Sequence, residues 1–119
     1  MDDLYVNMIT LRERVKLLHF QTRLLSIHQT TDQFIADFDL LSDAFWEVMQ
    51  GSDFRIELEQ SKSMQLDNTK TPSDLNNIFE IVIEGLMSIK EHMMSHPVVV
   101  SVDNLLERIN KFKYLLTFE

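Results

Sequence analysis

Residues 26–51 read SIHQTTDQFIADFDLLSDAFWEVMQG. The apolar residues of this stretch recur at the spacing of one helical face, which predicts an amphipathic helix. The stripe consists of Phe34, Phe38, Leu41, Phe45, Val48 and Met49. Gly51 follows directly, at the position where a helix C-cap belongs. We therefore expect a helix over about 26–50 that buries one face against other elements.

Three further segments, at about 3–25, 71–96 and 98–118, have the same helical spacing. The chain of 119 residues holds only two glycines and two prolines, too few for the many turns of a sheet protein. Its length is that of one domain. The sequence therefore predicts a single all-α domain over residues 1–119, built as a four-helix bundle.

The limits of these helices are marked to different degrees. Thr71, Pro72 and Asp74 form a typical helix start, with Thr as N-cap, Pro in the first turn and Asp at the third position. We expect the pair 96–97, His followed by Pro, to end the third helix, because the residue before a proline is pushed out of the helical region. Between the first two segments, either Ser26 caps a new helix or both segments form one continuous helix.

The connection between the second and third helices is long, at about 52–70. Phe54, Ile56 and Leu58 alternate with charged residues there, which favours a short extended piece. A link of this length can carry the chain from one end of a bundle to the other. The second and third helices would then run parallel, as in bundles with one crossover.

Charge and composition exclude several classes of function. The net charge is −8, and binding to nucleic acid or to an anionic membrane needs clustered Lys and Arg, so we expect neither. The chain has no Cys, so a metal would be held by His and carboxylates. The acidic start, at residues 1–3, does not resemble a secretory signal, and we expect a soluble cytoplasmic protein. No motif for an organic cofactor or a small-molecule substrate is present.

A helical projection of the segment 26–50 places His28, Asp32, Asp43 and Glu47 on one arc of about 100°. Nitrogen and carboxylate ligands of this kind suit iron, manganese or zinc. His28 and Asp43 are about 22 Å apart along the axis, so they belong to two separate half-sites. Trp46 projects onto the same arc, where an exposed aromatic residue indicates an interface. An alternative is that the arc is only the charged, solvated face of an amphipathic helix.

The stretch that carries these residues resembles a known family. The segment His19-Phe20-Gln21-Thr22, then His28, then Asp43-Ala44-Phe45-Trp46-Glu47 with Gln50-Gly51, is similar to ferritin-like proteins of the starvation-induced DNA-protection (Dps) type. It resembles still more closely a small ferritin-like family of large DNA viruses and phages. The resemblance covers about 17–51 and implies a ferritin-like bundle with a long crossover between helices 2 and 3. It does not extend to a Lys-rich tail.

The resemblance also implies a metal site. Its metal ligands correspond to His19, His28, Asp32, Asp43 and Glu47, and the metal it implies is iron, with ferroxidase activity as the related reaction. In one unbroken helix His19 and His28 would face opposite sides, so a break near 23–26 is needed to bring them together. A two-fold axis crossing the helix near 35–38 would join the two half-sites of two copies. We therefore expect a homodimer or a larger homo-oligomer.

A second hypothesis is a helical bundle without catalytic activity that serves as a structural or assembly component, for example in a virion. The intact set of His28, Asp32, Asp43 and Glu47 favours the iron hypothesis. The small size of the chain leaves the structural one open. In either case the location would be the cytoplasm, or a virion if the protein is viral.

Overall fold

The computed structural model describes residues 2–52, 54–93 and 95–118. This part of the chain contains no β-strand, and its regular structure is entirely helical. The elements are α1 (Asp2–Gln21), α2 (Leu25–Gly51), the short 3-10 helix η1 (Pro72–Leu75), α3 (Asn76–His92) and α4 (His96–Leu115). The prediction of an all-α fold with four helices is therefore confirmed.

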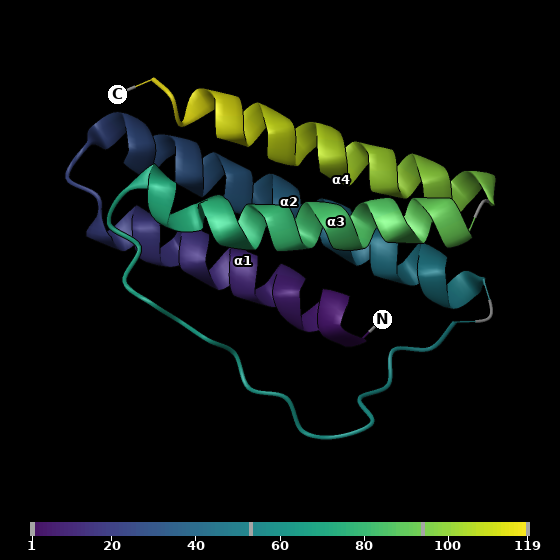
Figure 1. The fold of residues 1–119 in the computed structure, drawn as a ribbon. Coiled ribbons are helices and arrows are strands. Elements are labelled where there is room, and N and C mark those ends of the chain that lie inside the picture. Colours follow the sequence, from purple (N-terminus) through teal and green to yellow (C-terminus); the bar gives the residue numbers. More distant parts are fainter. Residues whose placement is uncertain (1, 53, 94, 119) are drawn as a thin grey trace.

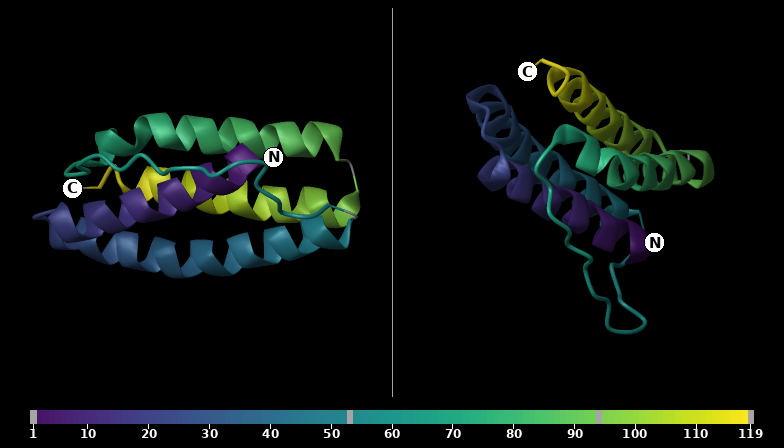
Figure 2. Two further views of the ribbon diagram at one scale, coloured as in Figure 1. Left: turned by 90° about the horizontal axis from the view of Figure 1, so that it is seen from below. Right: turned by 60° about the vertical axis from the view of Figure 1, so that its left-hand side comes forward.

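The four helices lie side by side around a common core. The chain turns back between α1 and α2, and after α2 it returns along the outside to the start of η1, so that α2 and α3 run in the same direction (Figure 1). α1 packs against α2 and α3, and α4 packs against the same two helices. Figure 2 shows the long connection passing outside the helices in two further views. The predicted crossover between the second and third helices is thus present.

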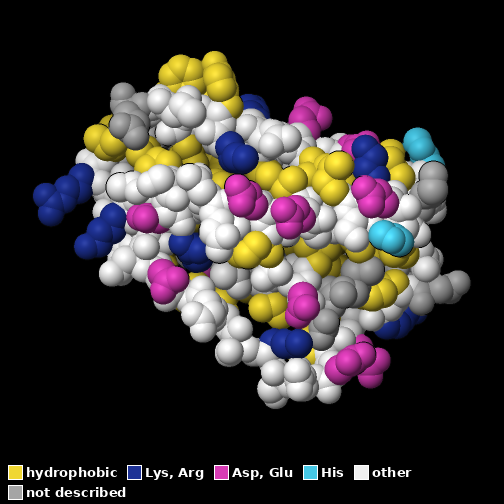
Figure 3. All heavy atoms as spheres, viewed as in Figure 1, with side chains coloured by type: hydrophobic (Ala, Val, Ile, Leu, Met, Phe, Trp, Pro, Cys, Tyr) yellow, Lys and Arg dark blue, Asp and Glu magenta, His cyan; other side chains and the backbone are white. Residues whose placement is uncertain are grey.

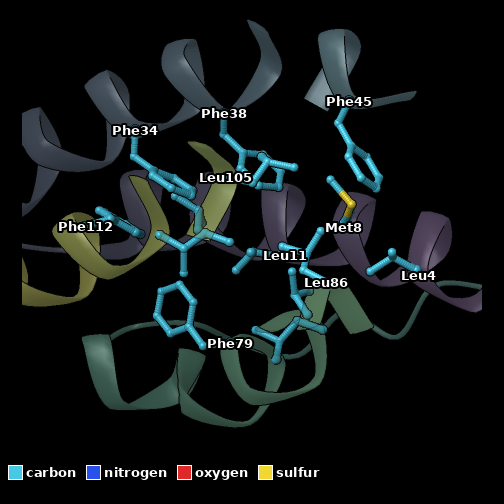
Figure 4. Packing of buried hydrophobic residues seen from close by; sticks show 14 of the residues in the cluster. Leu4, Met8, Leu11, Phe34, Phe38, Phe45, Phe79, Leu86, Leu105 and Phe112 are labelled. Atoms are coloured by element: carbon cyan, nitrogen blue, oxygen red, sulfur yellow. The ribbon is translucent and has the colours of Figure 1, made fainter. Parts of the chain in front are cut away.

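The core is one continuous cluster of apolar side chains to which every helix contributes. Phe34 and Phe38 of α2 point inward, and the Phe112 ring of α4 stacks on Phe34 with centroids 4.0 Å apart (Figure 4). Met8 and Leu11 enter from α1, and further residues come from α3 (Figure 4). The stripe spaced at one helical face therefore became the buried face, as the sequence predicts.

The helix limits differ from the predictions in two places. Residues 22–24 are not helical, so α1 and α2 are separate helices and the first one ends earlier than expected. The N-cap of α2 is Leu24, so the expectation that Ser26 caps a new helix is wrong. The prediction that His96 and Pro97 end the third helix is wrong, because α3 ends at His92 and His96 begins α4. A proline is tolerated in a first helical turn, where its missing N–H has no intrahelical partner to lose. The capping box of Thr71 and Asp74 is present as predicted.

The crossover contains no strand in residues 54–70, so the expected extended piece is only an irregular segment. The alternation of apolar and charged residues nevertheless corresponds to alternating burial, since Phe54 and Ile56 are half-buried against the core. The far end of the crossover is tied to α1, because the backbone N–H of Thr69 donates to the Gln21 side chain at 2.8 Å. Lys62 forms an ion pair with Asp3 at 3.5 Å. These contacts hold the crossover along α1.

No described helix combines the length and the apolar character that crossing a membrane would require.

Candidate functional site

His19 and His28 face each other across the turn between α1 and α2. Their rings stack with centroids 3.9 Å apart and an interplanar angle of 21°. His19, in the last turn of α1, is buried with 8% of its surface exposed, whereas His28, in the first turn of α2, is exposed. The break at residues 22–24 thus brings together two residues that one continuous helix would hold apart.

Each histidine is bonded to the backbone of the other. His19 Nδ1 lies 2.9 Å from the carbonyl oxygen of His28, and His28 Nδ1 lies 3.0 Å from the carbonyl oxygen of His19. A carbonyl oxygen only accepts, so both Nδ1 atoms must carry the proton. In the neutral rings both Nε2 atoms then keep a lone pair, which is the state required of a metal ligand.

Thr31, which was not predicted as a site residue, belongs to the same group. Its hydroxyl is fully buried, lies 3.0 Å from His19 Nδ1, and donates to the backbone oxygens of Ile27 and His28. The signal in the sequence is positional, because Thr31 continues the buried face that runs from Ile27 to Phe34. A polar residue at a buried position of an amphipathic helix needs specific partners, which here are two backbone oxygens and the His19 ring.

The three predicted carboxylates lie on the outer face of α2 and do not join the histidine pair as one cluster. Asp32, Asp43 and Glu47 are all exposed. Asp32 is one turn beyond His28, whereas Asp43 and Glu47 are near the other end of the helix. Within the described residues, no group of three or more His, Asp and Glu is close enough to hold a metal. A single copy therefore separates the predicted residues into the pair of His19 and His28 and the three exposed carboxylates.

A fourth carboxylate on this face, Asp39, is already neutralised. The Arg12 guanidinium donates two hydrogen bonds of 3.2 Å each to the Asp39 carboxylate. A third hydrogen bond, of 2.9 Å, joins Arg12 to Glu13. These bonds, foremost the one to Asp39, raise the pKa of Arg12 above its ordinary value. Arg12, Asp39 and Asp43 line a groove between α1 and α2 that has a volume of about 340 Å³. Asp43 makes no hydrogen bond to any other described residue, so it remains available to a ligand.

The expectation of an exposed Trp46 is wrong. Only 8% of its surface is exposed, because Tyr5 of α1 packs edge-on against its ring at 5.4 Å and Phe54 of the crossover lies 6.4 Å away. A helical projection treats the second helix as if it were covered on one side only. Here α1 and the crossover cover a second side, so Trp46 gives no evidence for an interface.

Comparison with protein-family models, with curated proteins and with solved structures gives no match to this chain. The assignment of a function therefore rests on the residues and their geometry.

Proposed function

We propose that the protein is a Dps-like ferritin relative that binds iron between two copies of the chain, with oxidation of ferrous iron as its associated reaction. The observation that carries this proposal is the pair His19 and His28, whose Nδ1 atoms are both bonded to backbone carbonyls. Metal-binding histidines characteristically donate their second ring N–H to such an acceptor, which fixes the ring and the tautomer. The one-crossover arrangement of four helices supports the ferritin-like assignment.

The spacing of the ligands on α2 supports a site shared between two copies. The pair His28 and Glu47 and the pair Asp32 and Asp43 have the same midpoint, between residues 37 and 38. A two-fold axis at this point would place His28 opposite the partner's Glu47 and Asp32 opposite the partner's Asp43, with the two helices antiparallel. An isologous contact of this kind creates two equivalent sites.

The face of α2 between the half-sites is suited to such a contact. Leu40 is 74% exposed, and Ala36 and Ala44 are exposed on the same side of the helix. Ala36 lies close to the proposed axis and has no side chain beyond Cβ that would hold two helices apart. Burying Leu40 against the second copy would contribute roughly 1.5–3 kcal/mol per side chain.

In the completed site one copy provides His19, His28 and Asp32, and the other provides Asp43 and Glu47. Two imidazole nitrogens and three carboxylates form a ligand set typical of iron that is held without sulfur. The carboxylates offset the charge of the metal and can bridge two ions. Four of these five residues, all except the buried His19, are exposed on a single copy, which gives ferrous iron access to them before the contact closes.

Iron analysis of matched variants tests the proposal. Protein reconstituted with ferrous iron without oxygen should retain iron after desalting, and Asp43→Asn with Glu47→Gln should abolish this while the helical circular dichroism remains. Asp39→Asn is the control, because Asp39 lies on the same face but is bonded to Arg12. Wild-type protein that retains no iron, or a double variant that retains as much as the wild type, would overturn the proposal.

The alternative is a structural bundle without metal chemistry. It is favoured by one observation, the ion pair of Asp39 and Arg12, which shows that this face also carries ordinary surface charge. Under this alternative the acidic variants above would leave every metal-dependent property unchanged, including the melting temperature in the presence of iron.

A further inference from the structure

The charges of the protein are separated along the long axis of the bundle. One end is formed where α1 and α4 finish and where α2 and η1 begin (Figure 1). We call it the basic end, because it carries Lys16, Arg23, Lys70, Lys111 and Lys113. Basic side chains project from this left-hand end in Figure 3. Acidic residues prevail in the opposite half, namely Asp3, Asp43, Glu47, Glu57, Glu59, Glu84, Glu91 and Asp103.

Three acidic residues also lie at or near the basic end, namely Asp32 in the second turn of α2, Asp67 and Asp74. Asp74 uses one carboxylate oxygen to accept the backbone N–H groups of Lys70 and Thr71, so its charge stabilises the start of η1. Asp67 lies directly before Asn68 and Thr69, which are hydrogen-bonded to the Gln21 side chain. They do not outweigh the five basic side chains, so the basic end is locally cationic although the chain as a whole carries a net charge of −8.

The basic end also exposes large apolar side chains. Phe20, Leu24 and Leu25 at the turn between α1 and α2 are 68%, 43% and 68% exposed. Tyr114 and Phe118 at the end of α4 are 62% and 55% exposed and contact each other edge-on at 5.0 Å. Lys16 Nζ lies 5.1 Å from the centre of the Phe20 ring, so charge and apolar surface are intermixed. Five of the thirteen exposed large apolar side chains of the described residues thus lie at this one end, and such a group suits an interaction surface.

We propose that the basic end binds the surface of an anionic membrane. Protruding Phe and Leu side chains can enter the boundary between headgroups and acyl chains while Lys and Arg side chains contact the anionic headgroups. The net charge does not prevent this, because the molecule is 44 Å long and charges are screened over about 8 Å at physiological ionic strength. The net charge alone predicts no binding to an anionic membrane, whereas the separation of charge allows binding through the basic end.

Sedimentation with lipid vesicles in the absence of iron tests this inference, so that its outcome does not depend on whether the protein binds iron. Wild-type protein should sediment with vesicles that contain phosphatidylserine and stay in solution with pure phosphatidylcholine. Arg23→Gln with Lys111→Gln should weaken the binding by roughly ten- to thirty-fold, because each basic residue near the surface contributes about 1 kcal/mol. Phe20→Ser with Leu25→Ser should weaken it to a similar degree.

Matched controls lie at the other end and on another face. Arg55→Gln with Lys90→Gln removes the same charge from the acidic half, and Met87→Ser removes an apolar side chain that is 44% exposed on α3. Both should bind vesicles like the wild type, and circular dichroism should show that all variants fold. Wild-type protein that ignores phosphatidylserine vesicles, or control variants as weak as the basic-end variants, would overturn the inference. So would basic-end variants that change only the oligomeric state, because the surface would then be a contact between copies.

Discussion

The rings of His19 and His28 stack at 3.9 Å, and each donates its Nδ1–H to the backbone carbonyl of the other residue. This reciprocal arrangement joins the last turn of α1 to the first turn of α2 without any glycine or proline in the intervening turn, 22–24. It provides a donor for two backbone oxygens at the helix junction, and no hydrogen bond within the described residues uses either Nε2 atom. The same geometry therefore shapes the turn and prepares the candidate ligands.

Substitution of Thr31 tests the support of this pair. Thr31→Val keeps the shape of the side chain but removes the contact with His19, so the free energy of unfolding should fall by about 1 kcal/mol more than for Thr10→Val. Thr10 is the matched control, since it is also buried and also donates to the backbone oxygen four residues before it, at 2.8 Å. Equal losses in urea denaturation would show that the contact with His19 contributes nothing.

The ion pair of Arg108 and Asp37 should stabilise the contact between α2 and α4. Arg108 Nε donates to Asp37 at 2.8 Å, and the arginine side chain is only 11% exposed above the Phe34 ring. Asp37→Asn should lower the free energy of unfolding by about 1–2 kcal/mol, because it leaves a largely buried guanidinium without its counter-charge.

The pair of Lys90 and Asp103 provides the control for this substitution. It has the same N–O distance of 2.8 Å, but both side chains are well exposed. Asp103→Asn should therefore change the stability by less than about 0.5 kcal/mol. An effect of Asp103→Asn as large as that of Asp37→Asn in thermal denaturation would contradict the assignment of importance to burial.

Gly85 allows α1 to approach α3 closely. A Cβ at this position would lie 2.8 Å from Leu4 Cδ1, so Gly85→Ala should gain less than the roughly 1 kcal/mol that alanine normally adds within a helix. In a Leu4→Ala background the full gain should appear, because the obstructing methyl group is gone. Gly51→Ala, with open space around its Cβ, is the control. Identical effects in both Leu4 backgrounds would rule out the close approach.

The hydrogen bonds of the Asp74 carboxylate should make the stability of the protein fall in acid. Backbone N–H groups, first that of Thr71 and then that of Lys70, lower the pKa of Asp74 below its ordinary value of 3.8. A group with a depressed pKa in the folded state stabilises the protein above that ordinary value and ceases to do so as the pH falls below it.

Asp74→Ala should accordingly melt at a lower temperature than the wild type at pH 7, and the difference should shrink below about pH 3.8. Asp67→Ala is the control, since the Asp67 carboxylate makes no hydrogen bond to any described residue. A difference between Asp74→Ala and the wild type that is constant from pH 7 to pH 3 would contradict this account.

The helices were predictable from the sequence because each buried face depends on residues close together in the chain. Phe34 and Phe38 alone indicate the inner side of α2. The burial of Trp46 was not predictable in this way, since it depends on Tyr5 and Phe54, which lie far from it in the sequence. The start of α4 at His96 was missed for a local reason, because the rule for residues before proline does not distinguish the end of one helix from the first turn of the next.

The candidate site divides in the same way. The positions of the carboxylates on one face of α2 follow from helical spacing. The pairing of His19 with His28 requires a break between two helices, and the sequence did not decide between one continuous helix and two. The hydrogen bonds of Thr31 and Gln21 were not predicted, because their partners, His19 and Thr69, lie on other segments of the chain. Contacts between elements are what a projection of one helix cannot contain.

Mixing two defective variants tests whether an iron site is built from residues of two copies. His28→Ala with Asp32→Ala destroys one half-site, and Asp43→Asn with Glu47→Gln destroys the other, so neither variant alone should bind iron. After dissociation and reassociation of an equal mixture, half of the dimers combine both variants and each of these holds one intact site. The mixture should then bind about a quarter of the iron that wild-type protein binds. No recovery of iron binding in a mixture that has demonstrably exchanged its subunits would contradict a site shared between copies.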